Sequence, residues 1–222
     1  MKRKATKQSG SKSKRRRMAK KEKKPTFTQV RRMIAGTQET KHKYWVPASV
    51  TMYDGVFYAM NPLYGISQGT GGDGMIGDEL QLKSITINLH YETSGTSANG
   101  YINFAVIRSP KQISDLGNQD FNTATNTNFI YDSGGNASLW RLDPEKCTVV
   151  KRKRVRVLRY DSAANGKAFS VGARINKKWK INRDTQYGKF YNYYLVAWAQ
   201  VIGGGLNGYT ITSNVLVTYK DS

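Results

Sequence analysis

The chain has 222 residues, enough for one large domain or two small ones, and 38% of them are hydrophobic, so it can form a core. Lys and Arg number 36 against 15 Asp and Glu, a formal net charge of +21. One cysteine, Cys147, and two histidines, His42 and His90, exclude a disulfide framework and a Cys/His zinc site. No apolar run is long enough for a membrane-spanning helix. No apolar segment follows the charged start, so the sequence predicts no secretory signal.

Positive charge is concentrated in residues 1–24, which hold 13 Lys and Arg and one acidic residue, Glu22, a net charge of +12. This segment has no aromatic residue, so it cannot bury enough surface to offset the entropy of ordering its backbone. We predict a disordered basic arm that binds a phosphate backbone through counterion release, without base readout. The binding residues expected in the arm and its linker are Lys2, Arg3, Lys4, Lys7, Lys12, Lys14, Arg15, Arg16, Arg17, Lys20, Lys21, Lys23, Lys24, Arg31 and Arg32.

The arm also contains two short basic clusters ten residues apart, the spacing of a two-part nuclear import signal. The residues of this predicted signal are Lys2, Arg3, Lys4, Lys14, Arg15, Arg16 and Arg17. The same side chains can serve both roles, so a host import receptor is a second expected partner. No amphipathic apolar face accompanies the charge, so membrane insertion is not expected.

From about residue 43 onward the pattern changes to short strands. Apolar and polar residues alternate over residues 80–92, with one slip of phase near Lys83 and Ser84 that indicates a β-bulge. Helical periodicity is limited to a turn or two at residues 27–34 or 111–116. The segments expected as strands are residues 44–53, 55–60, 80–92, 101–108, 128–131, 148–160, 168–181, 190–202 and 209–219.

Residues 111–145 are rich in Asn, Thr, Asp and Gly and are predicted as one or two long surface loops. Many short strands separated by Gly, Asn and Ser predict an all-β sandwich or barrel.

The chemistry of an enzyme is missing from the sequence. Residues 69–74 match the dinucleotide pattern G-x-G-x-x-G, but a strand pattern follows where phosphate binding requires the N-terminus of a helix. We therefore interpret this run as a loop or bulge. Neither His42 nor His90 has the sequence context of a catalytic triad. We predict no enzymatic activity, no cofactor and no bound metal.

Two further basic clusters lie in the body. Strand alternation places Arg152, Arg154 and Arg156 on one face. Val155 and Val157 then lie on the reverse face, as in a core strand with one charged, solvated surface. We expect these arginines to add a second layer of nucleic-acid contacts behind the arm.

The second body cluster surrounds an aromatic residue. Trp179 lies among Lys177, Lys178 and Lys180. An aromatic ring between cations can stack on an unpaired base. The other interpretation is that Trp179 is a core or subunit-contact residue that the lysines only flank, and both interpretations stay open at this point.

The order of these features resembles a known family. After the basic arm come residues 66–70 (ISQGT), residues 75–78 (MIGD) and the strand at 80–92. This resembles the entry segment in coat proteins of small circular single-stranded DNA viruses, the circovirus-like group, and is similar to plant satellite-virus coat proteins with RNA genomes. Met75 departs from the family pattern, which frequently has Arg before Ile-Gly. The later matching stretches are residues 155–182, Tyr193–Trp198 (YYLVAW) and Val215–Asp221 (VLVTYKD).

The resemblance implies a single eight-stranded jelly roll of two four-stranded sheets, with residues 1–40 as arm and linker and residues 41–222 as the capsid domain. It also implies a closed icosahedral shell, most simply of sixty copies, with the arms directed inward. Sixty chains at +21 carry about 1,260 positive charges, enough to neutralise much of a genome of roughly one to two kilobases.

The leading hypothesis is a capsid protein that self-assembles and packages a single-stranded genome, DNA being favoured over RNA, in the virion and, during assembly, the host nucleus. The alternative is a cellular β-barrel nucleic-acid-binding protein. A third class is a lectin-like polyanion-binding protein of the cell surface, and the missing export signal in the sequence counts against it. A capsid exterior can, however, itself bind cell-surface glycans.

Overall fold

The structure is a computed structural model, and the chain divides into two units, residues 1–37 and 38–222. In the first unit the amide of Val30 donates to the carbonyl oxygen of Thr26 (2.9 Å), the hydrogen bond of a helical turn where the sequence predicts one. The residues that the structure describes are 26, 27, 30, 39–66, 77–93, 99–110, 120–124, 128–131, 137, 139–158, 165–181, 188–202 and 208–221.

One sheet, which we call sheet A, contains five strands in the order β1-β10-β4-β8, with β2 also paired to β10. The other, sheet B, also contains five, in the order β6-β3-β9-β5-β7. All of these strand pairs are antiparallel. The strands of sheet A are β1 (Thr40–Trp45), β2 (Val50–Met52), β4 (Glu79–Thr93), β8 (Asn165–Lys180) and β10 (Tyr209–Asp221). Those of sheet B are β3 (Phe57–Met60), β5 (Gly100–Ser109), β6 (Asn122–Thr123), β7 (Thr148–Val157) and β9 (Asn192–Val201).

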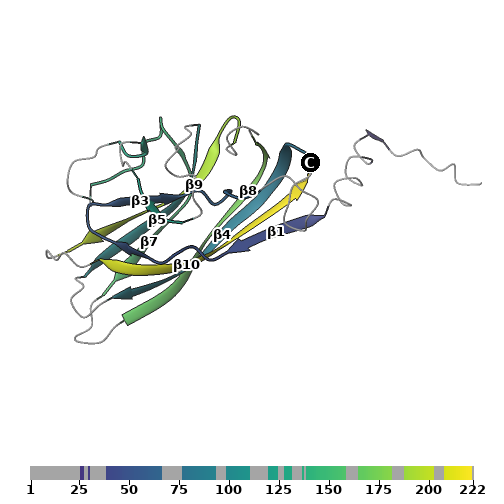
Figure 1. Cartoon of the computed structure of the whole chain (residues 1–222). Helices are drawn as coiled ribbons and strands as arrows, with labels where there is room; N and C mark the ends of the chain where they lie inside the picture. The colour runs from purple at the N-terminus through teal and green to yellow at the C-terminus, as the bar shows by residue number, and fades with distance from the viewer. Residues whose placement is uncertain are drawn as a thin grey trace, which may run out of the picture. The chain divides into compact units, whose positions relative to one another are not determined.

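The connectivity is that of a jelly roll (Figure 1). Along the sequence, the chain alternates between the two sheets. From β3 to β10, leaving out the short β6, the strands lie in sheets B, A, B, B, A, B and A. Without the short β2 and β6, each sheet has four strands, which gives the eight strands of two interlocked Greek keys. The predicted all-β jelly-roll sandwich is confirmed.

The main core lies between the two sheets. Along β4 the residues Leu80, Leu82, Ile85 and Ile87 are fully buried, and the step of three between Leu82 and Ile85 is the slip of phase seen in the sequence. The pairing of β4 with β8 shifts register between Leu82 and Ser84, so the predicted bulge is confirmed. Without the bulge at Lys83, the rest of β4 would turn its apolar residues to the outer face.

One predicted strand, at residues 44–53, is wrong in extent. The structure has two strands there, β1 ending at Trp45 and β2 starting at Val50. Pro47 lies in the interruption and has no amide hydrogen for a strand ladder. β1 also begins earlier than predicted, at Thr40, where Lys41 forms an ion pair with Asp221 (2.8 Å).

The prediction of surface loops at residues 111–145 missed a second hydrophobic cluster. Phe129 and Trp140, at 0% and 4% exposure, pack with Phe57, Tyr194 and Trp198 of sheet B. The ring centroids of Phe129 and Tyr194 lie 5.4 Å apart, and those of Phe57 and Trp198 5.8 Å apart. Phe129, Ile130 and Trp140 therefore cover part of the outer face of sheet B. The predicted strand at residues 128–131 is also wrong, because only an isolated bridge from Ile130 to Leu142 forms there.

Candidate nucleic-acid interface

The arm residues expected to bind nucleic acid, and the predicted import signal within them, lie outside the described residues. The same holds for the glycine-rich run at residues 69–74. The contact residues that the structure places are those of the two body clusters, on β7 and β8.

Strand β7 forms the arginine row, which we define as Arg152, Arg154 and Arg156. All three side chains are exposed, whereas Val155 and Val157 are 7% and 0% exposed in the main core. The predicted alternation of faces is therefore confirmed. The row lies on the outer face of sheet B because Val155 and Val157 face the core. It runs along the border of that sheet because β7 is its edge strand.

Neutral partners from β5 and β9 hold two of these guanidinium groups in place. Arg154 lies 3.8 Å over the Tyr101 ring and donates to Gln200 Oε1 (2.8 Å). Both partners are explained by register, because Tyr101 pairs with Arg156 on one side and with Gln200 on the other. The sequence analysis did not single out Tyr101 and Gln200, because the strands that carry them, β5 and β9, are apolar almost throughout and show no period-2 alternation.

Arg152 is the more enclosed of the two. Its guanidinium lies 5.5 Å over the Trp198 ring and donates to Asn103 Oδ1 (3.5 Å). Burial lowers the pKa of Arg152 from its usual value, and repulsion from the neighbouring Arg154 lowers it further. The group still stays charged at neutral pH, since a free guanidinium titrates above about 12.

Within the described part of the chain, no carboxylate forms an ion pair with any member of the arginine row. Among the described residues, neutral dipoles and π faces are the partners of Arg152 and Arg154. Guanidinium groups fixed in this way can donate to phosphate or sulfate oxygens without first breaking an ion pair.

The lysines of β8 lie on the edge strand of sheet A. Lys177, Lys178 and Lys180 are exposed, and Lys178 forms an ion pair with Glu79. Just before them Asn176 has a positive φ of 48°, the left-handed conformation that Asn tolerates better than most residues. Here β8 bulges against β4 and the strand changes phase.

Trp179 is not a nucleic-acid contact of the chain as it stands. Its side chain is 2% exposed and packs in the main core, opposite Leu80 of β4. A ring so enclosed offers no face to a base, so the stacking interpretation is wrong and the core interpretation holds. Burial follows from alternation, since Trp179 shares its side of β8 with the buried Ile181.

The two clusters share one edge of the sandwich but not one face. β7 and β8 lie close together, and Lys153 Nζ on β7 donates to the carbonyl oxygen of Ser170 on β8 (3.0 Å). The arginine row belongs to the outer face of sheet B, whereas Lys178 pairs with Gln81 on the outer face of sheet A. The outer faces of two packed sheets point in opposite directions, so one flat polyanionic surface cannot meet both sets.

No three His, Cys, Asp or Glu side chains within the described ranges gather closely enough to hold a metal ion. In the same ranges no helix is long and apolar enough to cross a membrane.

No protein-family model matches the sequence, and no curated protein matches it. Solved structures similar to the chain include Desmodium yellow mottle tymovirus, at 12% identity and a TM-score of 0.35 over 82% of this chain and 86% of that one. Another is the crystal structure of the 60-mer BFDV capsid protein, at 11% identity and a TM-score of 0.32 over 83% of this chain and 93% of that one. The jelly-roll fold follows from the strand order of the chain itself.

Proposed function

We propose that this protein is a capsid subunit that assembles into a closed shell and packages single-stranded nucleic acid through its basic N-terminal segment. The observation that carries the proposal is the separation of charge and fold along the chain. Residues 1–24 have a net charge of +12, and the unit from residue 38 onward contains the jelly-roll sandwich. A segment of this charge density binds phosphates independently of base sequence.

The domain assignment, with residues 1–40 as arm and linker and 41–222 as shell domain, is part of this proposal. So are an icosahedral shell of sixty copies, a DNA genome rather than RNA, and the absence of catalysis. The basic clusters of the arm would direct the protein to the host nucleus through an import receptor. In the virion, the outward surface would meet cell-surface glycans.

Three forms of the full protein test the proposal. The first is the natural chain, the second lacks residues 2–24, and the third keeps the length but replaces the 13 Lys and Arg of residues 1–24 by Gln. Each is expressed, sedimented and examined by electron microscopy, and nucleic acid in the particles is typed with DNase and RNase. We expect particles of roughly 1.5 MDa from sixty 25.0 kDa chains.

Both altered forms should keep the folded body and its ability to oligomerise but lose the packaged nucleic acid. Shells of the Gln form that protect nucleic acid of the natural length would refute the role of the arm. A natural chain that sediments as a 25.0 kDa monomer at all concentrations would refute the shell and favour a cellular nucleic-acid-binding protein.

A further inference from the structure

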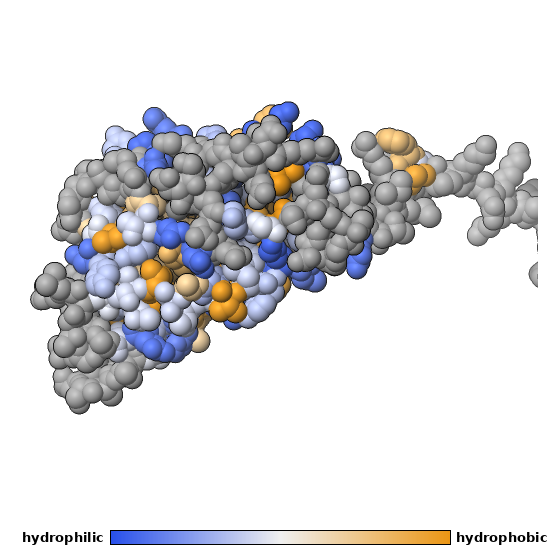
Figure 2. Space-filling model, in the orientation of Figure 1, coloured by the Kyte–Doolittle hydropathy of each residue, from blue (hydrophilic) through white to orange (hydrophobic). Residues whose placement is uncertain are grey.

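The outer face of sheet A carries a hollow that the basic clusters do not explain. It has a volume of about 600 Å³, in the range of small-molecule sites. It forms because Ala168 and Ser170, which point outward at alternate positions of β8, are small, whereas β4 presents the longer Asn88 and His90 beside them. On the molecular side shown in Figure 2, hydrophobic residues are scattered among hydrophilic ones.

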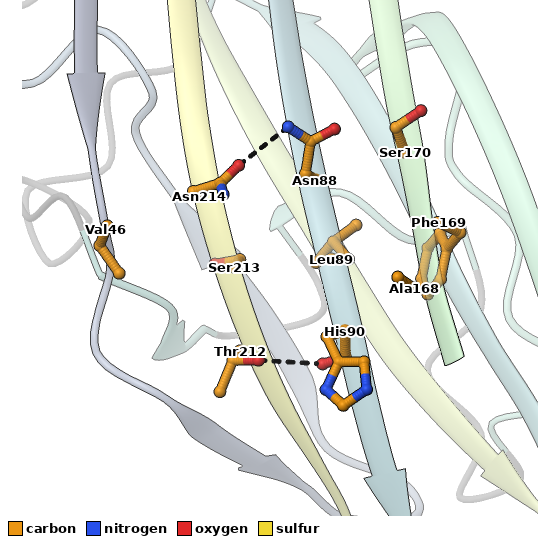
Figure 3. Close-up of a pocket in the computed structure, with 10 residues that line it drawn as sticks. All are labelled: Val46, Asn88, Leu89, His90, Ala168, Phe169, Ser170, Thr212, Ser213 and Asn214. Atoms are coloured by element: carbon orange, nitrogen blue, oxygen red, sulfur yellow. Dashed lines mark hydrogen bonds between the residues drawn. The ribbon is translucent and has the colours of Figure 1, made fainter. Parts of the chain in front are cut away.

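Apolar residues, among them Val46 and Leu89, line the hollow together with neutral hydrogen-bonding groups that form rows across three strands. One row is Asn214, Asn88 and Ser170, on β10, β4 and β8. Asn88 Nδ2 donates to Asn214 Oδ1 (2.9 Å), as Figure 3 shows. This bond leaves Asn88 Oδ1 as an acceptor and Asn214 Nδ2 as a donor, and neither is used by another described residue.

The next row contains Thr212 and His90. Thr212 Oγ1 donates to the carbonyl oxygen of His90 (3.4 Å), and His90 Nδ1 lies 3.4 Å from Glu92 Oε1. The imidazole depends on a glycine: a Cβ on Gly166 would lie 2.6 Å from His90 Nε2. The backbone of β8 therefore approaches closely at Gly166, and the ring lies at the margin of the hollow.

An aromatic ring and a cation flank these rows on the same face. Tyr44 of β1 is 60% exposed and pairs with the outward Leu216, two residues along β10 from Asn214. Arg174 points outward on β8, two residues beyond Gly172. β1 is also the first strand of the unit that follows residues 1–37 in the sequence.

From this arrangement we infer that the outer face of sheet A binds unpaired nucleobases, with Tyr44 as a stacking platform and the Asn88–Asn214 pair hydrogen-bonding to a base edge in the hollow. Amide donors and acceptors of this kind pair with base edges, whereas phosphates take the cations. Arg174 is then placed to contact the backbone of the bound strand. This inference rests on the proposed function, because it assumes that single-stranded nucleic acid is the ligand.

The test compares two single strands of about 12 nucleotides: a natural strand, which has all its bases, and an abasic strand, from which every base has been removed. Both present the same phosphates to the arm, so a difference in Kd between them measures base contacts. Full-length subunits are titrated by fluorescence anisotropy as the natural chain, Tyr44→Ala and Ser170→Leu, which fills the hollow. Tyr131→Ala is the matched control, because this tyrosine is 75% exposed and follows the Phe129–Ile130 segment over sheet B.

We expect the natural chain to bind the natural strand at least fivefold more tightly than the abasic one, the effect of stacking one base. Tyr44→Ala and Ser170→Leu should bring this ratio toward one without changing the abasic Kd, and Tyr131→Ala should leave it unchanged. Photocrosslinking with a 5-iodouracil strand should place an adduct on Tyr44.

Two outcomes separate the inference from the proposed function. Equal affinity for both strands in the natural chain, or a base preference that survives both variants, overturns the nucleobase site and leaves phosphate binding by the arm intact. No salt-dependent binding of either strand overturns the proposed function itself. Thermal melting of each variant identifies any loss of fold, and the comparison of the two strands with the natural chain needs no variant.

Discussion

The arginine row gives a prediction whose size follows from the structure. Each Lys or Arg that neutralises a phosphate of a single strand contributes about 0.7 to the slope of log K against log salt concentration. Arg152, Arg154 and Arg156 are three exposed charges with no described carboxylate partner. The triple variant to Gln should therefore lower the slope by about 2, and the Gln form of the arm, with 13 charges removed, by up to about 9.

The order among the single variants also follows from the contacts. Arg152 is held against Trp198 and Asn103, so part of its surface is covered, while the described residues provide Arg156 with no such contact. Arg156→Gln should therefore change the slope more than Arg152→Gln. The ratio of the binding constants of the natural chain and the triple variant should change about a hundredfold over a tenfold change in salt concentration.

The assay is anisotropy of a labelled single strand with free subunits, titrated at four or more salt concentrations. A triple variant to Lys is the matched control: it keeps the charge and loses the fixed guanidinium geometry, so its slope should stay natural. Arg141→Gln removes one exposed charge elsewhere and controls for net charge. An unchanged slope in the Gln triple, with the melting temperature retained, would refute the reasoning, and so would an equal loss of slope in the Lys triple.

Three further predictions concern the fold. Trp179→Ala should lower the free energy of unfolding by about 3–5 kcal/mol in denaturant titrations, because a large buried side chain is removed, whereas Lys177→Ala, at an exposed site, should change it little. Burial raises the pKa of Tyr193 and of Tyr209 to about 12. Each phenol therefore contributes its full stabilisation below about pH 10, and this contribution, roughly 2–3 kcal/mol each, is lost as the pH rises through 12. Tyr193→Phe should therefore make the decrease in stability at alkaline pH smaller. Burial, with repulsion from Asp143, raises the pKa of Cys147 to about 11, so its thiol should stay unreactive toward a disulfide reagent at pH 8 until the chain unfolds.

Local patterns were sufficient to predict most of the strands. Alternation in β4 and β7 depends only on which side of one strand faces the core, so the bulge near Lys83 and the arginine row were both predictable. The same logic applied to Trp179 and Ile181, two residues apart and both apolar, would have assigned the ring to the core. Both interpretations of Trp179 stayed open at the sequence level because its charged neighbours suit a stacking site while its phase suits the core.

Other features depend on contacts between distant segments. Phe129 and Trp140 lie in a segment without periodicity, and only the fold brings Phe57 and Tyr194 against them. The hollow on sheet A likewise needs three strands in register: Asn88 and Asn214 are 126 residues apart in sequence. No local pattern in either strand indicates that pair.

The arginine row lies on the outer face of sheet B and Tyr44 on the outer face of sheet A, so the two lie on opposite sides of the sandwich. In a closed shell, only one of these two faces can point toward the packaged nucleic acid. A closed shell presents one face of each subunit to its contents. A site on sheet A that binds the bases of a packaged strand requires that face, which carries Tyr44, to be the inner one. The arginine row would then meet polyanions outside the shell, although it strengthens binding by a free subunit. The salt dependence of binding by free subunits and the nucleic-acid content of assembled shells therefore test different surfaces. If the Gln triple variant of the arginine row has a smaller salt slope as a free subunit but its shells still contain the normal amount of nucleic acid, the row lies on the exterior of the shell.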